Sequence, residues 1–382
     1  LRFTAGGHSL AIMLGETEDD CAYAPTPLYH GYANFVGFAP AFHKGACFAS
    51  RRRFSASEFL SDVRRHGATV FCYVGELCRY LMRTPESPHD RDHAIRVATG
   101  SGLRPDIWQA FQERFGIPRI IDSYGQSEGN ISLQNRRGRV GSCGRAQPFT
   151  HHLLKLARYD HERGDLVRDE DGFLVECRVG ETGELLGKID ARSTMAFDGY
   201  ADAKDNERKL IRDGFEKGDL YLRTGDLLRR DYESYYYFVD RIGDTFRWKG
   251  ENVATMEVEH LLNTSPSIHE SAVYGVRVPG SDGRAGMALV VPASDASFDP
   301  EAFHAWVTAA LPRYARPLFV RIAGEVDATG TFKPRKTRLQ SEGFDPSAVG
   351  TDPLWLRDDE RRTYVPLDAR LFAQIRDGTR RL

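Results

Sequence analysis

Hydrophobic and polar positions follow two alternating patterns over residues 1–139, one typical of helices and one typical of strands. Apolar side chains at helical spacing, or a Pro in the first turn, mark four segments: residues 3–14, 55–65, 77–82 and 105–115. Short runs rich in apolar, β-branched and aromatic side chains mark four more: residues 21–28, 68–74, 95–99 and 117–122. Because segments typical of helices alternate with segments typical of buried strands, the pattern predicts a parallel α/β sheet. Ser55 is expected to cap the second helix.

From residue 140 the pattern changes to short alternating segments separated by Gly: residues 153–156, 173–177 and 184–189. Such segments predict an antiparallel region of the small β-barrel kind. The last part of the chain returns to mixed helices and strands and predicts a separate, smaller α+β domain. We therefore expect a large domain over 1–241, α/β over 1–139 and β-rich over 140–241, followed by a small domain over 242–382.

The longest apolar run, residues 32–42, contains Asn34, Gly37 and Pro40 and is too short to span a bilayer. We interpret it as buried core. The sequence shows no signal peptide. It opens at Leu1 inside a helix-like stretch, without an initiator Met, and we expect it to be part of a longer protein.

Composition narrows the choice of partners and compartment. The 52 basic and 54 acidic residues give a net charge of −2, which predicts no general attraction for nucleic acid. The run Arg51, Arg52 and Arg53 is interpreted as a solvated turn. The six cysteines are scattered without a CxxC pair, as expected for reduced thiols in a cytosolic protein.

The sharpest motif spans residues 124–130 and follows a predicted strand, where open α/β sheets place their ligands. Tyr124 offers a flat surface for a base, and Gly125 lets the backbone approach a ligand closely. The Ser127 hydroxyl can meet a phosphate oxygen, and the Glu128 carboxylate can hold magnesium. An ordinary Gly-rich turn explains the same residues equally well.

Four further motifs are weaker taken singly. Asp226 follows a predicted strand and can accept both hydroxyls of a ribose, or simply form an Asx turn. Arg241 can meet phosphate or ribose, and Gly250 can let a chain pass against the backbone, although a solvated charged hairpin accounts for both. Lys333, in a Gly- and Thr-rich loop, can place a mobile charge on a phosphoryl oxygen. His30, in an apolar loop, is more often structural than catalytic.

The order and spacing of these motifs favour the ligand-binding interpretations over the ordinary structural ones. Over nearly the whole chain the sequence resembles the fatty-acid transport protein and very-long-chain acyl-CoA synthetase branch of the adenylate-forming enzymes. Beyond the core motifs, five stretches carry the resemblance: residues 74–81, 102–104 ahead of Trp108, 243–255, 283–287 and 329–333. Matches of this length and order are highly specific.

The resemblance implies a fatty-acid-CoA ligase of the adenylate-forming fold that uses ATP, Mg²⁺ and coenzyme A in two half-reactions. The carboxylate attacks the α-phosphate of ATP, and the thiol of coenzyme A then displaces AMP. By resemblance, Tyr124 stacks on adenine, with Ser101 and Gly102 beside it and Gly125 next in the motif. Ser127 meets the α-phosphate, and Glu128 holds magnesium.

For the second part of the chain, the resemblance implies that Asp226 binds the ribose and that Arg241 supports the nucleotide. Lys333 stabilises the charge of adenylation. The small domain then rotates about a hinge, after which Gly250 lines the pantetheine path and His30 gates its inner end. The hinge position carries Gly243 where many relatives have Asp or Lys.

The family's phosphate-binding loop, which ends in a Lys, is missing from this sequence. We therefore expect an isolated piece to be inactive. Two rival functions stay open: adenylation of a non-fatty acid or delivery to a carrier protein, and a non-catalytic lipid- or nucleotide-binding uptake component. The expected partners are a fatty acid, ATP and coenzyme A, with no nucleic acid. The expected location is the cytoplasm or the cytoplasmic face of a membrane, to which the protein can attach peripherally.

Overall fold

In the computed structural model, the described residues are 2–126, 129–148, 150–190, 199, 203–293, 297–329, 334–380 and 382. They form two compact units. Unit 1 comprises Leu1–Tyr159, Leu166–Thr224 and Leu228–Phe238. Unit 2 comprises Asp160–Asp165, Gly225–Leu227 and Val239–Leu382.

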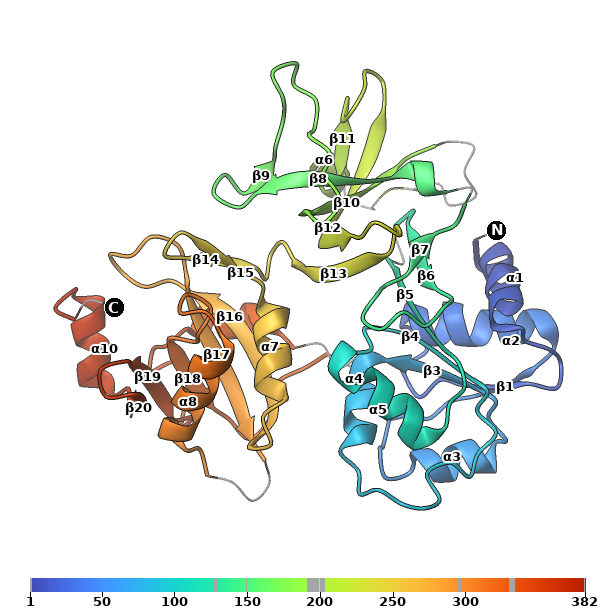
Figure 1. Ribbon diagram of the computed structural model, residues 1–382, viewed down its shortest axis with the longest axis horizontal. Coiled ribbons are helices and arrows are strands. Elements are labelled where there is room, and N and C mark those ends of the chain that lie inside the picture. The colour runs from blue at the N-terminus through green and yellow to red at the C-terminus, as the bar shows by residue number, and fades with distance from the viewer. Residues whose placement is uncertain are drawn as a thin grey trace. The chain divides into compact units, whose positions relative to one another are not determined.

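A seven-stranded sheet in the order β2-β1-β3-β4-β5-β6-β7 organises the first part of unit 1 (Figure 1). Its strands are β1 (Cys21–Tyr23), β2 (Cys47–Ala49), β3 (Val70–Val74), β4 (Val97–Ser101), β5 (Ile120–Gly125), β6 (Ser132–Asn135) and β7 (Arg145–Ala146). The pairs from β2 to β5 are parallel, and β6 and β7 run antiparallel. The predicted parallel α/β sheet is confirmed.

Helices cover both faces of this sheet. Successive side chains of a strand point to opposite faces, so a strand that is apolar throughout presents apolar side chains for helices to cover on each face. Phe71 and Tyr73 of β3 belong to one core cluster, together with residues of α3 (Phe59–Arg65), α4 (Gly75–Met82) and α5 (Pro105–Phe115). Val70 and Cys72 belong to the cluster on the other side. That second cluster includes residues of α1 (Arg2–Leu14), the π-helix η1 (Tyr32–Phe38) and α2 (Ala39–Lys44).

Two local predictions are wrong. Ser55 does not cap a helix, because α3 begins only at Phe59 and the Ser55 hydroxyl instead lies 3.0 Å from that of Ser57. The apolar run over residues 32–42 is not buried as a whole. It folds into helices that bury their small side chains, such as Ala33 and Ala41, while Phe42 is 70% exposed.

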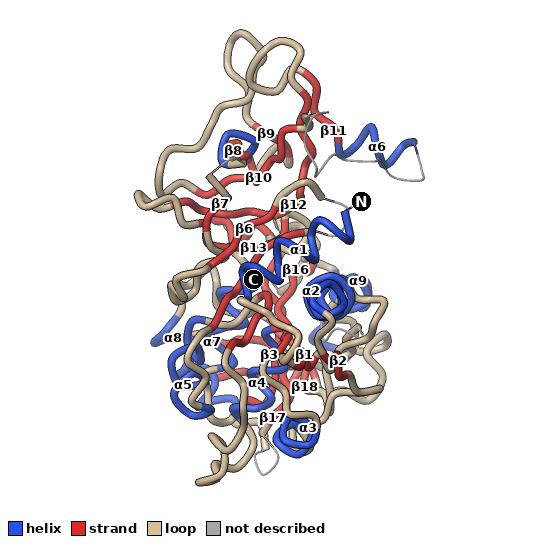
Figure 2. Tube along the Cα trace, turned by 90° about the vertical axis from the view of Figure 1, so that its right-hand side faces the viewer, coloured by secondary structure: helices blue, strands red, loops and turns tan. Residues whose placement is uncertain are grey.

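A six-stranded sheet follows in the order β11-β12-β10-β8-β9, with β13 paired to β12, and its β8–β10 and β11–β12 pairs are antiparallel. Its strands are β8 (Leu154–Asp160), β9 (Asp165–Leu166), β10 (Thr182–Lys188), β11 (Leu210–Arg212), β12 (Leu220–Arg230) and β13 (Tyr236–Arg241). Figure 2 shows that this part of the chain is mostly strand and loop, with the short helix α6 (Ala203–Lys209) beside β11. It corresponds to the antiparallel region predicted from residue 140 onward.

Unit 2 is built on a five-stranded sheet in the order β16-β17-β18-β19-β20. Its strands are β16 (Ile268–Val276), β17 (Ala285–Pro292), β18 (Phe319–Ile322), β19 (Leu354–Asp358) and β20 (Thr363–Pro366). The hairpin β14 (Phe246–Trp248) and β15 (Glu251–Val253) precedes it. The helices are α7 (Thr255–Asn263), α8 (Pro300–Ala310), α9 (Lys336–Glu342) and α10 (Ala369–Arg376). One hydrophobic core joins these elements.

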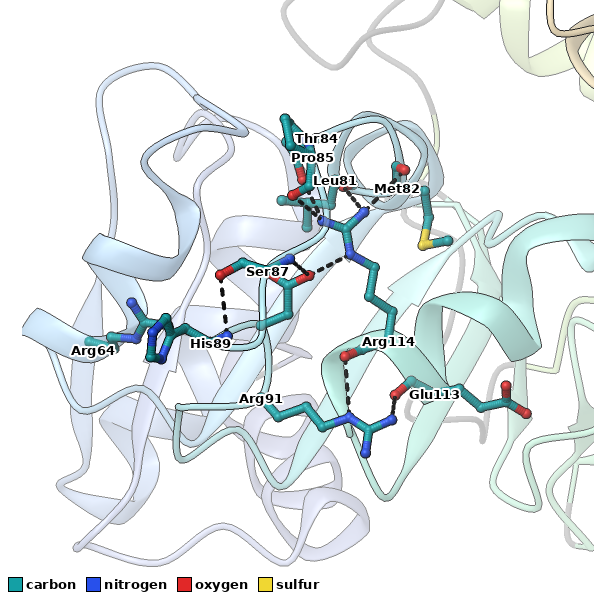
Figure 3. Close-up of polar contacts among 11 residues, drawn as sticks. Arg64, Leu81, Met82, Thr84, Pro85, Ser87, His89, Arg91, Glu113 and Arg114 are labelled. Carbon is teal, nitrogen blue, oxygen red and sulfur yellow. Dashed lines mark hydrogen bonds and ion pairs between the residues drawn. The ribbon is translucent and has the colours of Figure 1, made fainter.

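Arg114, near the C-terminus of α5, binds the end of α4 and the loop that follows it (Figure 3). Its Nε lies 2.7 Å from Asp90, and its remaining nitrogens donate to the carbonyl oxygens of Leu81, Met82 and Pro85 and to the Thr84 hydroxyl. Arg114 thus supplies donors to the carbonyls of the last two residues of α4, Leu81 and Met82, in addition to those that Thr84 gives to Leu81. The loop after α4 is therefore fixed to α5.

All six cysteines carry free thiols, and five of them are buried. Of the helices that the structure describes, none has the length and apolar character needed to cross a membrane.

Candidate functional site

The ends of β4 and β5 bring the first group of predicted residues together. The two strands are parallel neighbours, with Gly100 opposite Asp122, so Ser101 and Gly102 emerge beside Tyr124 at the carboxyl edge of the sheet. Gly102 has a φ of +81°, and a Cβ placed on it would meet no atom within 4 Å. The open space beside this loop is compatible with a flat ring approaching the backbone. Tyr124 is largely buried, and its ring lies 6.4 Å from that of Phe238.

Asp122 holds the Ser101–Gly102 loop through hydrogen bonds, and it was not among the predicted site residues. Its carboxylate accepts the backbone N–H of Leu103 at 2.9 Å, that of Gly102 at 3.3 Å and the Tyr73 hydroxyl at 3.0 Å. Burial raises the pKa of Asp122 to about 7, although these hydrogen bonds favour the ionised form. The signal that could have found it is a carboxylate at the end of a buried strand, directly ahead of the Tyr124 motif.

His30 reaches the same edge of the sheet through Tyr32. The backbone N–H of Tyr32 donates to His30 Nδ1 at 3.4 Å. The Tyr32 hydroxyl in turn bonds to the Gly100 carbonyl and to the Ser123 hydroxyl, at the ends of β4 and β5. Tyr32 begins the π-helix η1, an irregularity that is frequent at functional sites. The structure thus links His30 to the strands that carry Ser101 and Tyr124.

Two residues of the Tyr124 motif, Ser127 and Glu128, lie outside the described residues. The preceding Gln126 donates from Nε2 to the Thr224 carbonyl at 2.9 Å. Within the part of the chain that the structure describes, no three His, Cys, Asp or Glu side chains gather in a way that could hold a metal ion.

In unit 2, Asp226 and Arg241 form a pair, with 3.6 Å between Arg241 Nε and Asp226 Oδ1. The Asp226 side chain is 7% exposed, whereas that of Arg241 is 52% exposed. The backbone supports the pair, because the Ile242 N–H donates to the Gly225 carbonyl at 2.9 Å. A carboxylate held beside a solvent-facing guanidinium can accept two vicinal hydroxyls while a positive charge stays available to an anion.

Gly250 lies in the two-residue turn between β14 and β15. Trp248 pairs with Glu251, and the two residues between them, Lys249 and Gly250, have φ values of +50° and +87°. Two successive positive φ values are typical of a type I′ hairpin turn, which explains a Gly here on conformational grounds alone. Gly243 differs, because it does not occupy the left-handed region and a Cβ on it would meet nothing within 4 Å.

Lys333 lies outside the described residues, but the segments on either side of it are held together. Ala328 forms an antiparallel bridge with Pro334, and the Arg335 N–H donates to the Asp327 carbonyl at 2.9 Å. The next residue, Lys336, is buried in unit 2 and was missed as a candidate.

The fold and these candidate sites together define a class of protein. A sheet covered by helices on both faces, with a ring-accessible loop at its carboxyl edge, together with a smaller α+β unit, is the architecture of adenylate-forming enzymes. The sequence model described as AMP-binding enzyme matches residues 4–200. The model described as AMP-binding enzyme C-terminal domain matches residues 257–333. The chain belongs to the AMP-binding enzyme family.

Curated relatives and solved structures agree with this assignment. Long-chain fatty acid transport protein 2 of Rattus norvegicus is 43% identical over 98% of this chain and 61% of its own length. Long-chain fatty acid transport protein 5 of Homo sapiens is 44% identical over 96% of this chain and 53% of its own length. The chain thus spans only about three fifths or less of these relatives.

Among solved structures, ATP-bound MatB from Rhodopseudomonas palustris matches with a TM-score of 0.72 at 21% identity. The match covers 89% of this chain and 63% of that one. A benzoate CoA ligase from Burkholderia xenovorans LB400 has a TM-score of 0.69 at 24% identity, over 88% of this chain and 65% of that one. At these identities the likeness shows the shared fold.

Proposed function

We propose that the full-length protein converts a long- or very-long-chain fatty acid to its acyl-CoA through an acyl-adenylate. The observation that carries this proposal is the identity of 43% over 98% of the chain with a long-chain fatty acid transport protein. Membership of the AMP-binding enzyme family supports the adenylate chemistry.

Two half-reactions make up the proposed activity. In the first, a carboxylate oxygen of the acid bonds to the α-phosphorus of ATP, and the bond from that phosphorus to the pyrophosphate breaks. In the second, the coenzyme A sulfur bonds to the acyl carbon and AMP leaves. The first step demands in-line positioning and charge neutralisation more than covalent help from the protein.

Each candidate residue has a place in this scheme. Tyr124, beside Ser101 and Gly102, would hold the adenine. Asp226 and Arg241 would hold the ribose. The adenine face is supported by the open space at Gly102, and the ribose role by the buried Asp226 carboxylate next to an exposed guanidinium.

The phosphates and coenzyme A would be handled by the other candidates. Ser127 would contact the α-phosphate, and Glu128 would hold the magnesium ion that accompanies ATP and neutralises its charge. Lys333 would stabilise the charge of the adenylation transition state. In the second half-reaction, Gly250 would face the pantetheine arm and His30 its inner end.

Apolar side chains next to His30 support an apolar acid as substrate. Leu28 and Tyr29 precede His30 and are 54% and 79% exposed, and Phe35 and Phe38 of η1 are each 36% exposed. All four lie within eight residues of His30 along the chain, and exposed large apolar side chains near a candidate site often mark a ligand-binding surface.

The test is an acid panel on the full-length protein, with AMP release and thioester formation measured in parallel. Long- and very-long-chain fatty acids should give both products, and Asp226→Ala should lower both. Preference for acetate or an aromatic acid would overturn the substrate class. Adenylation without thioester formation would point instead to transfer to a carrier protein.

A further inference from the structure

Lys336, the first residue of α9, carries a buried ammonium group in unit 2. Its Nζ lies 2.8 Å from Glu259 Oε1 and donates to Thr255 Oγ1 at 2.8 Å. The Lys336 side chain is only 9% exposed. Glu259 also accepts the Val273 N–H at 2.7 Å, so its carboxylate is held against both β16 and α9. A buried charge held at this distance from two partners has a fixed position.

A second carboxylate, Asp240, completes the cluster and is fully buried. It accepts the backbone N–H of Thr255 at 2.5 Å and the Thr255 hydroxyl at 3.1 Å. The same hydroxyl therefore accepts from Lys336 and donates to Asp240. On its other side, Asp240 accepts the N–H of Arg241 at 2.8 Å and the Thr245 hydroxyl at 3.2 Å.

The charges in this cluster depend on Lys336. Burial raises the pKa of Asp240 and of Glu259, and the nearby Lys336 ammonium opposes the rise in both. Burial lowers the pKa of Lys336, but Glu259, Asp244 and Asp240 outweigh it and raise that pKa above its ordinary value. Without the Lys336 ammonium, the buried carboxylates of Asp240 and Glu259 would lose the positive charge that compensates them, which is unfavourable for buried acidic groups.

The cluster of Lys336, Glu259, Thr255 and Asp240 connects to the Asp226–Arg241 pair of the candidate site. Arg241 is bound to Asp240 through its backbone and lies 3.6 Å from Asp226 through its side chain. We propose that Lys336 is a positioning residue: through Thr255 and Asp240 it holds the turn 240–245 in the conformation that places Arg241 against Asp226. The role in nucleotide binding rests on the proposed function, whereas the hold on the turn does not.

The experiment compares Lys336→Met with Lys336→Arg in the full-length protein, using two readouts. Hydrogen exchange of the peptide spanning 239–246 reports the turn directly, and calorimetry with AMP reports the affinity. Lys336→Met should speed exchange in that peptide and raise the Kd for AMP by about tenfold, as for loss of a coupled buried partner. Lys336→Arg keeps the charge and should stay within about threefold of wild type.

Arg321→Met is the matched control, because Arg321 is an equally buried cation elsewhere in unit 2. Its side chain is 9% exposed and pairs with Asp352 at 2.7 Å and with Glu342 at 2.5 Å. This variant should lower the Tm without changing either readout at the turn. If Lys336→Met unfolds the protein, the double variant Glu259→Gln/Lys336→Met removes the uncompensated carboxylate and still lacks the contact to Thr255.

The outcomes separate the two proposals. Unchanged exchange and AMP affinity in Lys336→Met, or equal changes in Arg321→Met, would overturn the positioning role. Faster exchange at the turn in a protein that binds no AMP even as wild type would support the hold on the turn and overturn the proposed function.

Discussion

Asp122, at the scale of single residues, shows how burial and hydrogen bonding compete for one proton. Three donors converge on its carboxylate and favour the ionised form, yet the group is inside the sheet, where a charge is poorly solvated. Burial dominates and raises its pKa to about 7. The residue that supports the Ser101–Gly102 loop therefore changes charge near neutral pH.

A pH dependence of stability follows. Between about pH 4 and pH 7, folded Asp122 holds a proton that the unfolded chain has released, so stability falls as the pH rises through this window. A pKa of about 7 instead of 3.8 corresponds to a loss of about 4 kcal/mol above pH 7. Asp122→Asn cannot ionise, and it can keep the bonds from Leu103 and Tyr73 on one oxygen.

The measurement is chemical denaturation of Asp122→Asn and wild type from pH 4 to pH 8. Wild type should lose stability relative to the variant as the pH rises, by a few kcal/mol in total. Glu16, whose pKa burial also raises to about 7, titrates in both proteins and cancels in the comparison. A difference that is constant across this range would show that Asp122 does not titrate there.

Gly75 gives a second prediction at this scale. A Cβ on Gly75 would lie 1.8 Å from the Gly102 carbonyl oxygen, so Gly75→Ala should displace the Gly102 loop. Forced overpacking of this kind costs about 1–3 kcal/mol. Gly243→Ala is the control, because a Cβ there meets nothing within 4 Å, and it should leave the Tm unchanged. An equal Tm for wild type and Gly75→Ala would show that the clash relaxes without cost.

At the scale of elements, buried polar anchors fix loops that the hydrophobic core does not reach. Arg114 binds Asp90 and the last carbonyls of α4 with its whole guanidinium, and both side chains are less than 10% exposed. Planar guanidinium groups suit this task because their donors form a rigid fork. Arg114 thus ties the loop after α4 to α5, together with Arg91 of the loop, which donates to the carbonyl oxygens of Glu113 and Arg114 (Figure 3).

Arg114→Met should accordingly be strongly destabilising. Removing one partner of a buried charged pair costs about 3–5 kcal/mol, since it leaves Asp90 buried without its cation. Arg91 is the natural control, because it is exposed and donates only to the carbonyl oxygens of Glu113 and Arg114. Arg91→Met should cost at most about 1 kcal/mol. Similar unfolding free energies for the two variants would contradict the anchoring role.

At the scale of the whole molecule, the two units carry different candidate residues. Tyr124 lies in unit 1, and Gly250 lies in unit 2. The proposed two half-reactions require the small domain to present Lys333 in one step and Gly250 in the other, a domain rotation of the hinge kind. The hinge at Gly243 stays a prediction.

The half-reactions can be separated by mutation in the full-length protein. Lys333→Ala should slow acyl-adenylate formation by roughly 10²–10³, as for loss of a preorganised charge, and spare thioester formation from supplied acyl-adenylate. Gly250→Trp should do the opposite by obstructing the pantetheine arm. Folding of Gly250→Trp is checked by its Tm, with Gly250→Ala as control for the positive φ. Equal slowing of both half-reactions by Lys333→Ala would refute its assigned role.

The sequence by itself determined the class of fold. Residues 68–74 are apolar and rich in β-branched and aromatic side chains because both faces of a parallel strand are buried, and the sequence shows this pattern without knowledge of the neighbouring strands. The sequence also indicated the ligand-binding loop at Tyr124, because the neighbouring glycines allow the backbone to approach a ligand closely. The family followed from the order of such motifs, which no single residue could specify.

Tertiary structure decided which side chains are buried and which polar groups meet. The run over residues 32–42 is mostly apolar, and only the packed fold shows that its small residues face the core while Phe42 is exposed. Asp122 and Lys336 are an ordinary Asp and an ordinary Lys in the sequence. Their importance comes from burial and from partners far along the chain, Tyr73 for the one and Thr255 for the other, which only the folded chain brings within hydrogen-bond distance.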